Sequence, residues 1–293
     1  MKSLDDFTVA IVGLGLMGGS LALALRERGA CRRIVGITRD PETRRAALAR
    51  GVVDAAGAEL ALAEAADAIV LATPVRTVLG QMEAVGRVAR AGTVVMDLGS
   101  TKREVTRAME GLPEHLEPLG GHPMCGRETA GFAAADAELY KGAVFVLTPL
   151  ARTAPETVAF GRSLVEAVGA RPLIMDPARH DRIVAAISHL PFTVATSLMA
   201  TTEELARGEE LLYTLASSGF RDTSRVAAKE TTVMLDILMT NRENVAAAAR
   251  ACAGKLGELA RLIEAGDEPA LRARLEVAAA SRRGLFRQRR ADG

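Results

Sequence analysis

The chain has no tryptophan and few aromatic residues of any kind. Phe, Trp and Tyr together make up 3% of its 293 residues, whereas 49% of the residues are hydrophobic. The core must therefore rest mainly on Ala, Leu, Val and Ile. The length suggests two domains, or one large one.

The chain also has few cysteines and a net charge close to zero. The three cysteines, Cys31, Cys125 and Cys252, are far apart and form no CxxC pair. This excludes a disulfide framework and a zinc site, and it predicts a cytoplasmic protein in a reducing compartment. Lys and Arg number 37 against 36 Asp and Glu. A dedicated nucleic-acid-binding protein would be clearly basic, so no nucleic-acid partner is expected.

Membrane and export signals are not evident. Residues 1–8 lack the charged-then-apolar pattern of a signal peptide. We identify no uncharged apolar run of the ~18 residues that a membrane span needs, so we expect no membrane partner.

Short apolar runs alternate with helical stretches over the first half of the chain. Such alternation predicts a parallel sheet covered by helices, whose strands are buried on both faces. The predicted strands are "VAIVG", "RIVGIT", "AIVLAT", "TVVMDLG", "AVFVLTP" and "RPLIMD". After Pro177 the strand signals stop and several apolar helices follow.

We therefore expect an α/β protein with two domains. Residues 1–176 should form a dinucleotide-binding Rossmann-type domain, and residues 177–293 an all-α domain for substrate binding and dimerisation. Long apolar helix faces in so small a domain usually pack against a partner, which predicts a homodimer.

The sequence "GLGLMG" places Gly13, Gly15 and Gly18 in a G-x-G-x-x-G pattern. It follows a predicted strand and opens a predicted helix, the context that makes the pattern meaningful. Gly13 permits the tight turn, Gly15 lets the backbone approach a pyrophosphate, and Gly18 lets helix and strand pack closely. The helix start, with Leu16 and Met17, then offers free N–H groups to the phosphates.

The second predicted strand favours NADP over NAD. A carboxylate normally ends this strand in NAD sites, where it binds the ribose 2′-hydroxyl. Here the position is Thr38, followed by Arg39, and a hydroxyl with a guanidinium suits a 2′-phosphate. Asp40 keeps NAD possible. Thr73 and Pro74, after another strand, are expected beside the nicotinamide ribose.

A second group of polar residues follows. Ser100 and Lys102 lie after an apolar strand, where ligands bind in open α/β sheets. His122 lies in "GGHPMCG", where flanking glycines are expected to leave its ring accessible. A neutral imidazole there could take a hydroxyl proton as hydride leaves the same carbon. Arg221 and Arg225 are four residues apart, on one face if helical.

The other histidines carry less signal. His115 and His180 stand in charged segments that we expect to be exposed, and we assign them no role. His189, in "SHLP", is either a packed helix residue or a site residue.

In combination, "GLGLMGGS", "DLGSTK", "GGHPMCGRETAG", "SHLPF" and "ASSGFRDTSR" resemble the prephenate/arogenate dehydrogenase family of tyrosine biosynthesis. They occur in family order over about residues 9–245. The last motif, with "SHLP" and Thr38-Arg39, most resembles NADP-dependent arogenate-type members of cyanobacteria.

The resemblance implies an NAD(P)-dependent oxidative decarboxylation of a cyclohexadienol, arogenate or prephenate. It makes His122 the base that hydrogen-bonds the C4 hydroxyl and Ser100 the residue that holds that hydroxyl and orients the imidazole. Arg221 would clamp a substrate carboxylate, and Arg225 would either assist or form an internal ion pair.

The remaining assignments are more open. Lys102 is either a source of positive potential for the substrate or a surface lysine, and His189 matches a family histidine near the site. Phe192 replaces the second histidine of the "HLPH" found in many prephenate-type members, which puts prephenate preference in doubt. Arg127 could recognise a second carboxylate or pair with Glu128, and Cys125 is a small filler.

Two other functions fit part of the pattern. β-Hydroxyacid dehydrogenases share the glycine motif, but they use a lysine in a glycine-rich helix, and neither Lys229 nor Lys255 has that setting. A non-catalytic NADP(H)-binding module is the second alternative, and the presence of both His122 and Ser100 argues against it.

Overall fold

The computed structural model describes residues 3–127 and 129–291, and the side chains as far as residue 285. The contacts divide the chain into two compact units, Met1–Val245 and Ala246–Gly293. The first contains the sheet and the helices that precede Arg242, and the second consists of most of helix α10 (Arg242–Glu264) and of helix α11 (Glu268–Ala291).

The first unit is built on one eight-stranded sheet with the order β3-β2-β1-β4-β5-β6-β7-β8. All neighbouring strands pair in parallel except β6 and β7, which are antiparallel. The expected Rossmann-type sheet followed by helices is thus confirmed. The strands are β1 (Thr8–Val12), β2 (Arg33–Ile37), β3 (Ala55–Gly57), β4 (Ala68–Leu71), β5 (Val94–Asp97), β6 (Glu117–Pro123), β7 (Val144–Pro149) and β8 (Arg171–Ile174).

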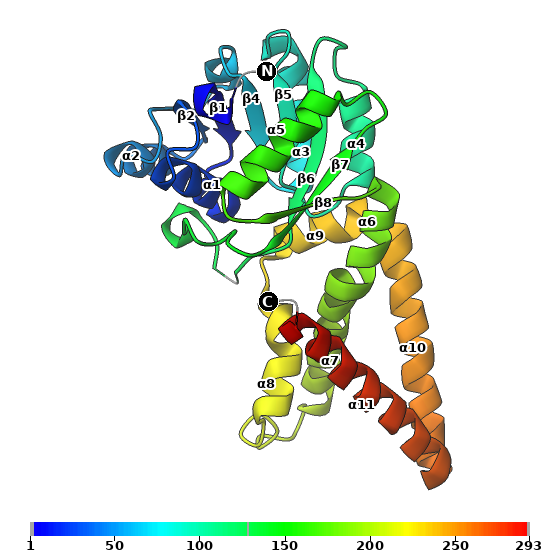
Figure 1. Ribbon diagram of the computed structural model, residues 1–293. Helices are drawn as coiled ribbons and strands as arrows, with labels where there is room; N and C mark the ends of the chain where they lie inside the picture. Colours follow the sequence, from blue (N-terminus) through cyan, green and yellow to red (C-terminus); the bar gives the residue numbers. More distant parts are fainter. Residues whose placement is uncertain (1–2, 128, 292–293) are drawn as a thin grey trace. The chain divides into compact units, whose positions relative to one another are not determined.

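Helices cover both faces of this sheet (Figure 1). One apolar cluster joins the sheet to α1 and α5, through residues such as Leu21 and Leu164. The other joins the opposite face to α3 and α4, through residues such as Val78 and Met109. Burial on both faces explains why the strands are continuously apolar. The helices are α1 (Leu16–Glu27), α2 (Pro41–Ala49), α3 (Val75–Val88), α4 (Arg103–Glu110) and α5 (Pro155–Ala167).

Strand β6 was not predicted, because "EPLGGHP" has no β-branched residue and carries two prolines and two glycines. Its glycines are required by close packing inside the sheet. A Cβ on Gly120 would lie 2.1 Å from Thr148 Oγ1, and one on Gly121 would lie 2.6 Å from the Asp97 carbonyl oxygen. The glycines therefore let β6 fit between β5 and β7.

After β8 the first unit is helical. The segment predicted as one helix around Pro191 contains α6 and α7 joined by a turn of π-helix, labelled η4. Pro191 has no N–H for the normal i→i−4 hydrogen bond, which accounts for the irregular turn before it. These elements are α6 (Pro177–Val184), η4 (Ala185–His189), α7 (Leu190–Leu205), α8 (Ser218–Ser224), η5 (Arg225–Ala228) and α9 (Thr231–Thr240).

The next predicted helix is also divided. Asn241, with φ −125° and ψ 28°, separates α9 from α10 (Arg242–Glu264). In the second unit, α10 is followed by a turn at Gly266 with φ +63° and then by α11 (Glu268–Ala291). Arg274 of α11 donates to Glu258 of α10 over 3.0 Å, which ties the two helices together.

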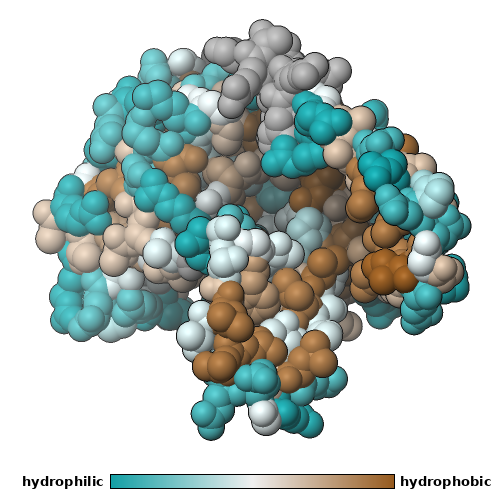
Figure 2. Space-filling view, turned by 90° about the horizontal axis from the view of Figure 1, so that it is seen from below, coloured by the Kyte–Doolittle hydropathy of each residue, from teal (hydrophilic) through white to brown (hydrophobic). Residues whose placement is uncertain are grey.

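The continuous helix Pro177–Leu205 is long and apolar enough to cross a membrane by length and composition, contrary to our reading of the sequence. Only 22% of its most apolar window is buried within this chain. Core and interface helices of soluble proteins pass the same test, so the finding is weak evidence for a membrane. Large apolar side chains are indeed exposed, among them Ile187 (61%), Leu205 (68%) and Leu215 (77%), and apolar atoms gather on the face seen in Figure 2.

Candidate functional site

The glycine loop between β1 and α1 has the geometry that the sequence predicts. Gly13 has φ +97°, a conformation that favours glycine. A Cβ on Gly18 would lie 1.9 Å from the Gly13 carbonyl oxygen, so only glycine permits this contact. Gly15 caps the start of α1, and a Cβ there would meet no protein atom within 4 Å. The absence of a side chain at Gly15 is therefore not required by the protein's own packing.

A cavity of about 360 Å³ opens beside this loop. Its wall includes Gly15 and the start of α1, the Thr73–Pro74 turn after β4, and Ser100 after β5. A helix N-terminus, a side-chain-free glycine and two strand ends around one cavity fit the pyrophosphate and ribose of a dinucleotide. The predicted cofactor and site residues that line it are Gly15, Leu16, Met17, Thr73, Pro74 and Ser100.

We expect Gly18→Ala to abolish dinucleotide binding. The new methyl group would overlap the Gly13 carbonyl, so helix α1 must move away from β1 and the loop must open. Titration of the purified variant with NADP⁺ and NAD⁺ measures the effect. Gly80→Ala is the control, because Gly80 lies on α3 and a Cβ there meets nothing within 4 Å. Unchanged affinity in Gly18→Ala would contradict the prediction.

The end of β2 carries the residues expected to select the cofactor. Thr38 is half-buried and Arg39 is exposed. The Asp40 carboxylate accepts hydrogen bonds from the backbone N–H groups of Glu42 and Thr43, and so caps helix α2. Bonds from Thr43 and Glu42 lower the pKa of Asp40. This carboxylate is thus already engaged within its own helix.

His122, on β6, belongs to a buried chain of side chains. Its Nδ1 lies 2.8 Å from Nε2 of His180, and Nδ1 of His180 lies 2.8 Å from Oδ1 of Asp181. Two expectations are corrected here. The His122 ring is only 8% exposed, since the neighbouring glycines serve sheet packing. His180 is 1% exposed on α6, where Asp181 is buried beside it while Arg179 and Arg182 are exposed.

Burial keeps His122 neutral. Its pKa lies well below the usual value, first because of desolvation and then because of electrostatic interactions with His180, Lys102 and His189. A neutral imidazole is the form that can accept a proton. Strands β5 and β6 pair in parallel, with Met96 opposite Leu119, so His122 near the carboxyl end of β6 lies at the same end of the sheet as Gly99, which lines the cavity.

Lys102 is not a surface residue, and it does not line the cavity beside the glycine loop. Its side chain is fully buried and ion-paired with Asp97, and its Nζ donates to the Gly121 carbonyl over 2.6 Å. Burial lowers the pKa of Lys102, while the Asp97 carboxylate opposes that shift. The surface-lysine alternative is therefore wrong, whereas the expected contribution of Lys102 to substrate binding stays a prediction. Lys102 joins the ends of β5 and β6, and it contributes only a nearby positive charge.

His189 is packed within the helical part. It ends the π-helical turn η4, is 1% exposed, and its Nδ1 lies 3.2 Å from Nδ2 of Asn241. The same Asn241 nitrogen donates to the Asp181 carbonyl over 2.8 Å. Since Asn241 Nδ2 is a donor, His189 accepts at Nδ1. Burial lowers the pKa of His189 to about 4, so the ring is neutral.

Arg221 and Arg225 do not line the cavity and do not share one regular helix. Arg221 lies on α8, is exposed, and pairs with Asp222 over 3.3 Å. Arg225 begins the 3-10 turn η5, which breaks the expected four-residue spacing on an α-helix.

Other charged groups reach the cavity instead. Arg127 lines it and is ion-paired with Asp136, whereas Glu128, its expected partner, is outside the described residues. Lys229 also lines the cavity, and the sequence analysis gave it no role. Burial raises the pKa of Cys125 to about 11, so this thiol is unreactive at neutral pH.

Helix α9 supplies one wall of the cavity through Val233, Met234 and Ile237. Asp236, on the same helix, accepts from the backbone N–H of Arg76 over 3.0 Å and from its Nε over 2.6 Å. This carboxylate therefore caps the start of α3 and fixes α9 beside the Thr73–Pro74 turn. No sequence motif indicated this contact.

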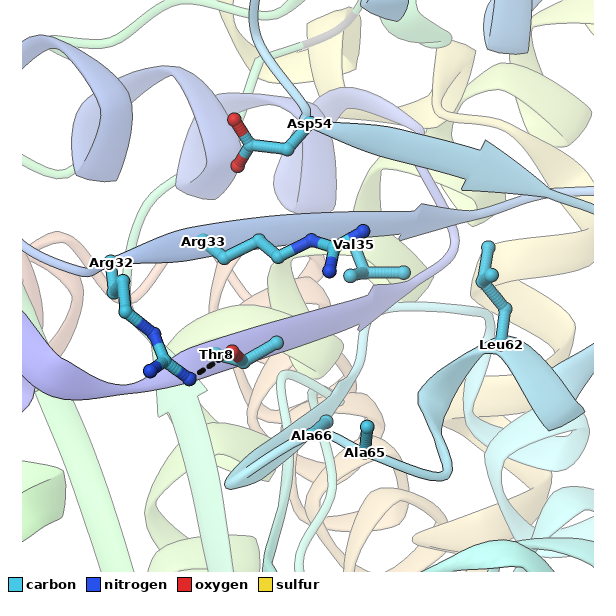
Figure 3. A pocket seen from close by; sticks show the side chains of 8 residues that line it. All are labelled: Thr8, Arg32, Arg33, Val35, Asp54, Leu62, Ala65 and Ala66. Atoms are coloured by element: carbon cyan, nitrogen blue, oxygen red, sulfur yellow. Dashed lines mark hydrogen bonds between the residues drawn. The ribbon is translucent and has the colours of Figure 1, made fainter.

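A larger, more open pocket of about 710 Å³ lies at the other edge of the sheet (Figure 3). It includes Thr8 and Arg33, the first residues of β1 and β2, and Arg32 donates to Thr8 Oγ1 over 3.2 Å. Because ligands of open α/β sheets bind at the carboxyl ends of strands, the smaller cavity is the functional candidate.

The fold and this cavity define a dinucleotide-dependent dehydrogenase of the Rossmann class. The family described as "Prephenate dehydrogenase, nucleotide-binding domain" matches residues 21–174, and "Prephenate dehydrogenase, dimerization domain" matches residues 176–277. The chain therefore belongs to the prephenate dehydrogenase family, whose members are NAD(P)-dependent oxidoreductases.

Individual relatives agree with this assignment. A prephenate dehydrogenase of Bacillus subtilis is 35% identical over 251 residues, which cover 84% of this chain and 67% of that protein. A prephenate dehydrogenase from A. aeolicus, solved with hydroxyphenyl propionate and NAD⁺, is 31% identical with a TM-score of 0.90, covering 97% of this chain and 100% of that one. Synechocystis arogenate dehydrogenase is 33% identical with a TM-score of 0.79, covering 94% and 98%.

Proposed function

We propose that this chain oxidatively decarboxylates arogenate or prephenate, with NADP as the preferred cofactor. The observation that carries the proposal is the neutral, buried His122 near the carboxyl end of β6, the same end of the sheet as the cavity that Ser100 and the glycine loop line. The cavity provides a dinucleotide site, and the imidazole provides a base at the same edge of the sheet.

In this reaction the substrate loses a hydride from C4 and its ring carboxylate as CO₂. A nicotinamide cofactor held by the glycine loop, Thr73 and Pro74 would supply the acceptor for this hydride. Nε2 of His122 accepts the proton of the C4 hydroxyl as the hydride leaves, and Ser100 holds that oxygen. As the C–CO₂ bond breaks, its electron pair makes the ring aromatic, and the proton returns to the oxygen. No net proton is released, so the residues mainly position the substrate and move one proton.

The substrate carboxylates require positive groups. Arg221 remains our predicted carboxylate clamp, with Arg225 and His189 as further substrate-binding residues. Arg127 and Lys229 are added as candidates, because both line the cavity. An arginine suits a carboxylate best, since its planar fork can donate two parallel hydrogen bonds.

The preference for NADP rests on the end of β2. Thr38 and Arg39 present a hydroxyl and a guanidinium, while the Asp40 carboxylate is occupied in capping α2. No other acidic residue stands between Thr38 and Pro41, so no free carboxylate is offered to a ribose 2′-hydroxyl.

We expect the double variant Thr38→Asp, Arg39→Ser to shift the preference from NADP toward NAD by roughly 10²-fold, the effect of replacing a charge-assisted pair by a repulsive carboxylate. The ratio of kcat/KM for the two cofactors measures it. Arg45→Ser is the control, since Arg45 is an exposed arginine on α2 that pairs with Glu42. A wild-type preference for NAD would refute the proposed cofactor choice.

One assay tests the function itself. Purified protein is given arogenate or prephenate with NADP⁺ or NAD⁺, and the reduced nicotinamide is followed by absorbance. The proposal expects turnover with at least one substrate, fastest with NADP⁺, and release of CO₂ equal to the nicotinamide reduced. Cofactor binding without turnover on either substrate would favour the non-catalytic alternative.

We also propose a cytoplasmic homodimer formed through the helical domain 177–293. The match to a dimerization domain over residues 176–277 supports it. The exposed apolar residues of η4 and α7, including Ile187 and Leu205, would be buried by such a partner. Light scattering of the purified chain gives its mass directly.

A further inference from the structure

The structure brings together three buried side chains in a continuous line. They are His122 on β6, and His180 and Asp181 on α6, with 2.8 Å between successive partner atoms. All three are nearly inaccessible, at 8%, 1% and 1% exposure. Because no solvent competes for these groups, the direction of each hydrogen bond is set by the group at the end of the line.

That end group is the Asp181 carboxylate. Its Oδ1 accepts the backbone N–H of Lys102 over 2.8 Å, and its Oδ2 accepts the backbone N–H of Arg103 over 2.9 Å. These donors form the start of helix α4, where the helix dipole favours a negative charge. Both oxygens thus act as acceptors, as they do in an ionised carboxylate.

The proton positions follow from this. An acceptor at Asp181 requires Nδ1 of His180 to donate. A neutral His180 then has a lone pair on Nε2, so Nδ1 of His122 must donate to it. The remaining nitrogen of His122, Nε2, is left without a proton. It forms no hydrogen bond to any residue within 3–127 or 129–285.

We infer that His180 and Asp181 are positioning residues that fix His122 in the tautomer with Nε2 free to act as the base. This inference rests on the proposed role of His122. An isolated imidazole would populate both neutral tautomers, and only one of them can take the hydroxyl proton at Nε2. The line also stabilises the imidazolium once it forms, since a charged ring donates more strongly through Nδ1.

Other ionisable groups surround the line from every side. They are Asp97 at the end of β5, Lys102 at the start of α4 and His189 on η4, with Lys229 acting on His189.

Nitrogen-15 NMR of histidine-labelled full-length protein tests the tautomer directly, since the chain has only four histidines. Variants His122→Asn and His115→Gln assign the signals. The inference expects a protonated Nδ1 and an unprotonated Nε2 in His122, and a mixture of tautomers in His180→Leu. A wild-type His122 protonated at Nε2, or an unchanged tautomer in His180→Leu, would overturn it.

Kinetics provide the second measurement. We expect His180→Leu to lower kcat by roughly 10²- to 10⁴-fold, as loss of the tautomer-fixing partner does elsewhere. The acid limb of kcat/KM should move to lower pH, because the imidazolium loses its acceptor. His180→Gln offers one donor and one acceptor, so it should restore both kcat and the position of the acid limb.

Two controls separate the possible failures. A purely structural role for His180 would reduce the amount of folded enzyme, measured by circular dichroism, without moving the acid limb, and that result would refute the inference. His115→Gln changes an exposed histidine and should match wild type. If neither substrate is oxidised by wild type, the proposed function fails, while the NMR result still decides the tautomer.

Discussion

His122→Asn is expected to lower kcat by roughly 10²- to 10⁴-fold, the usual contribution of a general base. The asparagine amide nitrogen lies near the position of Nδ1, so it can still donate to His180, but it has no counterpart of Nε2. The substitution therefore removes the proton acceptor while leaving the buried line intact. Stopped-flow absorbance of the reduced nicotinamide in a single turnover measures the hydride step.

Cofactor affinity should be nearly unchanged in the same variant, because His122 does not line the cavity beside the glycine loop. Titration with NADP⁺ checks this. His115→Gln again serves as the matched control, since it changes an exposed histidine that has no proposed role. Wild-type turnover in His122→Asn would remove this residue from the mechanism.

Lys102→Met should destabilise the protein by about 3–5 kcal/mol, the cost of leaving a buried charge without its partner. Methionine fills a similar space, but the Asp97 carboxylate then keeps only the N–H groups of Gly99 and Gly121. Urea unfolding followed by circular dichroism gives the free energy of unfolding. A loss below ~1 kcal/mol would show that the buried pair contributes little.

The double variant Asp97→Asn, Lys102→Met should lose less than Lys102→Met alone, because no net charge remains buried. Lys141→Met is the control for an exposed pair. Lys141 pairs with Glu138 at the surface, with its side chain 69% exposed, so its loss should cost less than ~1 kcal/mol. A destabilisation of similar size in both lysine variants would contradict the role of burial.

The glycine loop could be predicted because its constraints are local. Gly13, Gly15 and Gly18 act through the turn and the first turn of α1, and all three are close in the sequence. Strand β6 could not be predicted in this way. Its glycines are explained by Thr148 on β7 and by the Asp97 carbonyl on β5, neither of which is near in the chain.

Some polar residues of the site could likewise be placed from the local sequence, and others could not. Ser100 follows a strongly apolar strand, and its place at the cavity followed from that position. Lys102, two residues later, has similar local sequence, yet its side chain turns inward to Asp97. From its charge alone, Lys102 was expected to lie at the surface or to face the substrate. A lysine is buried only where the fold supplies a partner for its charge, and the local sequence does not show that partner.

By itself the sequence determined the sheet-and-helix class, the cofactor loop and the family, since these depend on apolar periodicity and on motifs of a few adjacent residues. Only the tertiary structure decided that His180 and Asp181 stand behind His122. His180 is 58 residues from His122 in the chain, and the packing of α6 against the sheet brings the two side chains together. Burial then excludes water, and each buried polar atom must find its partner within the protein.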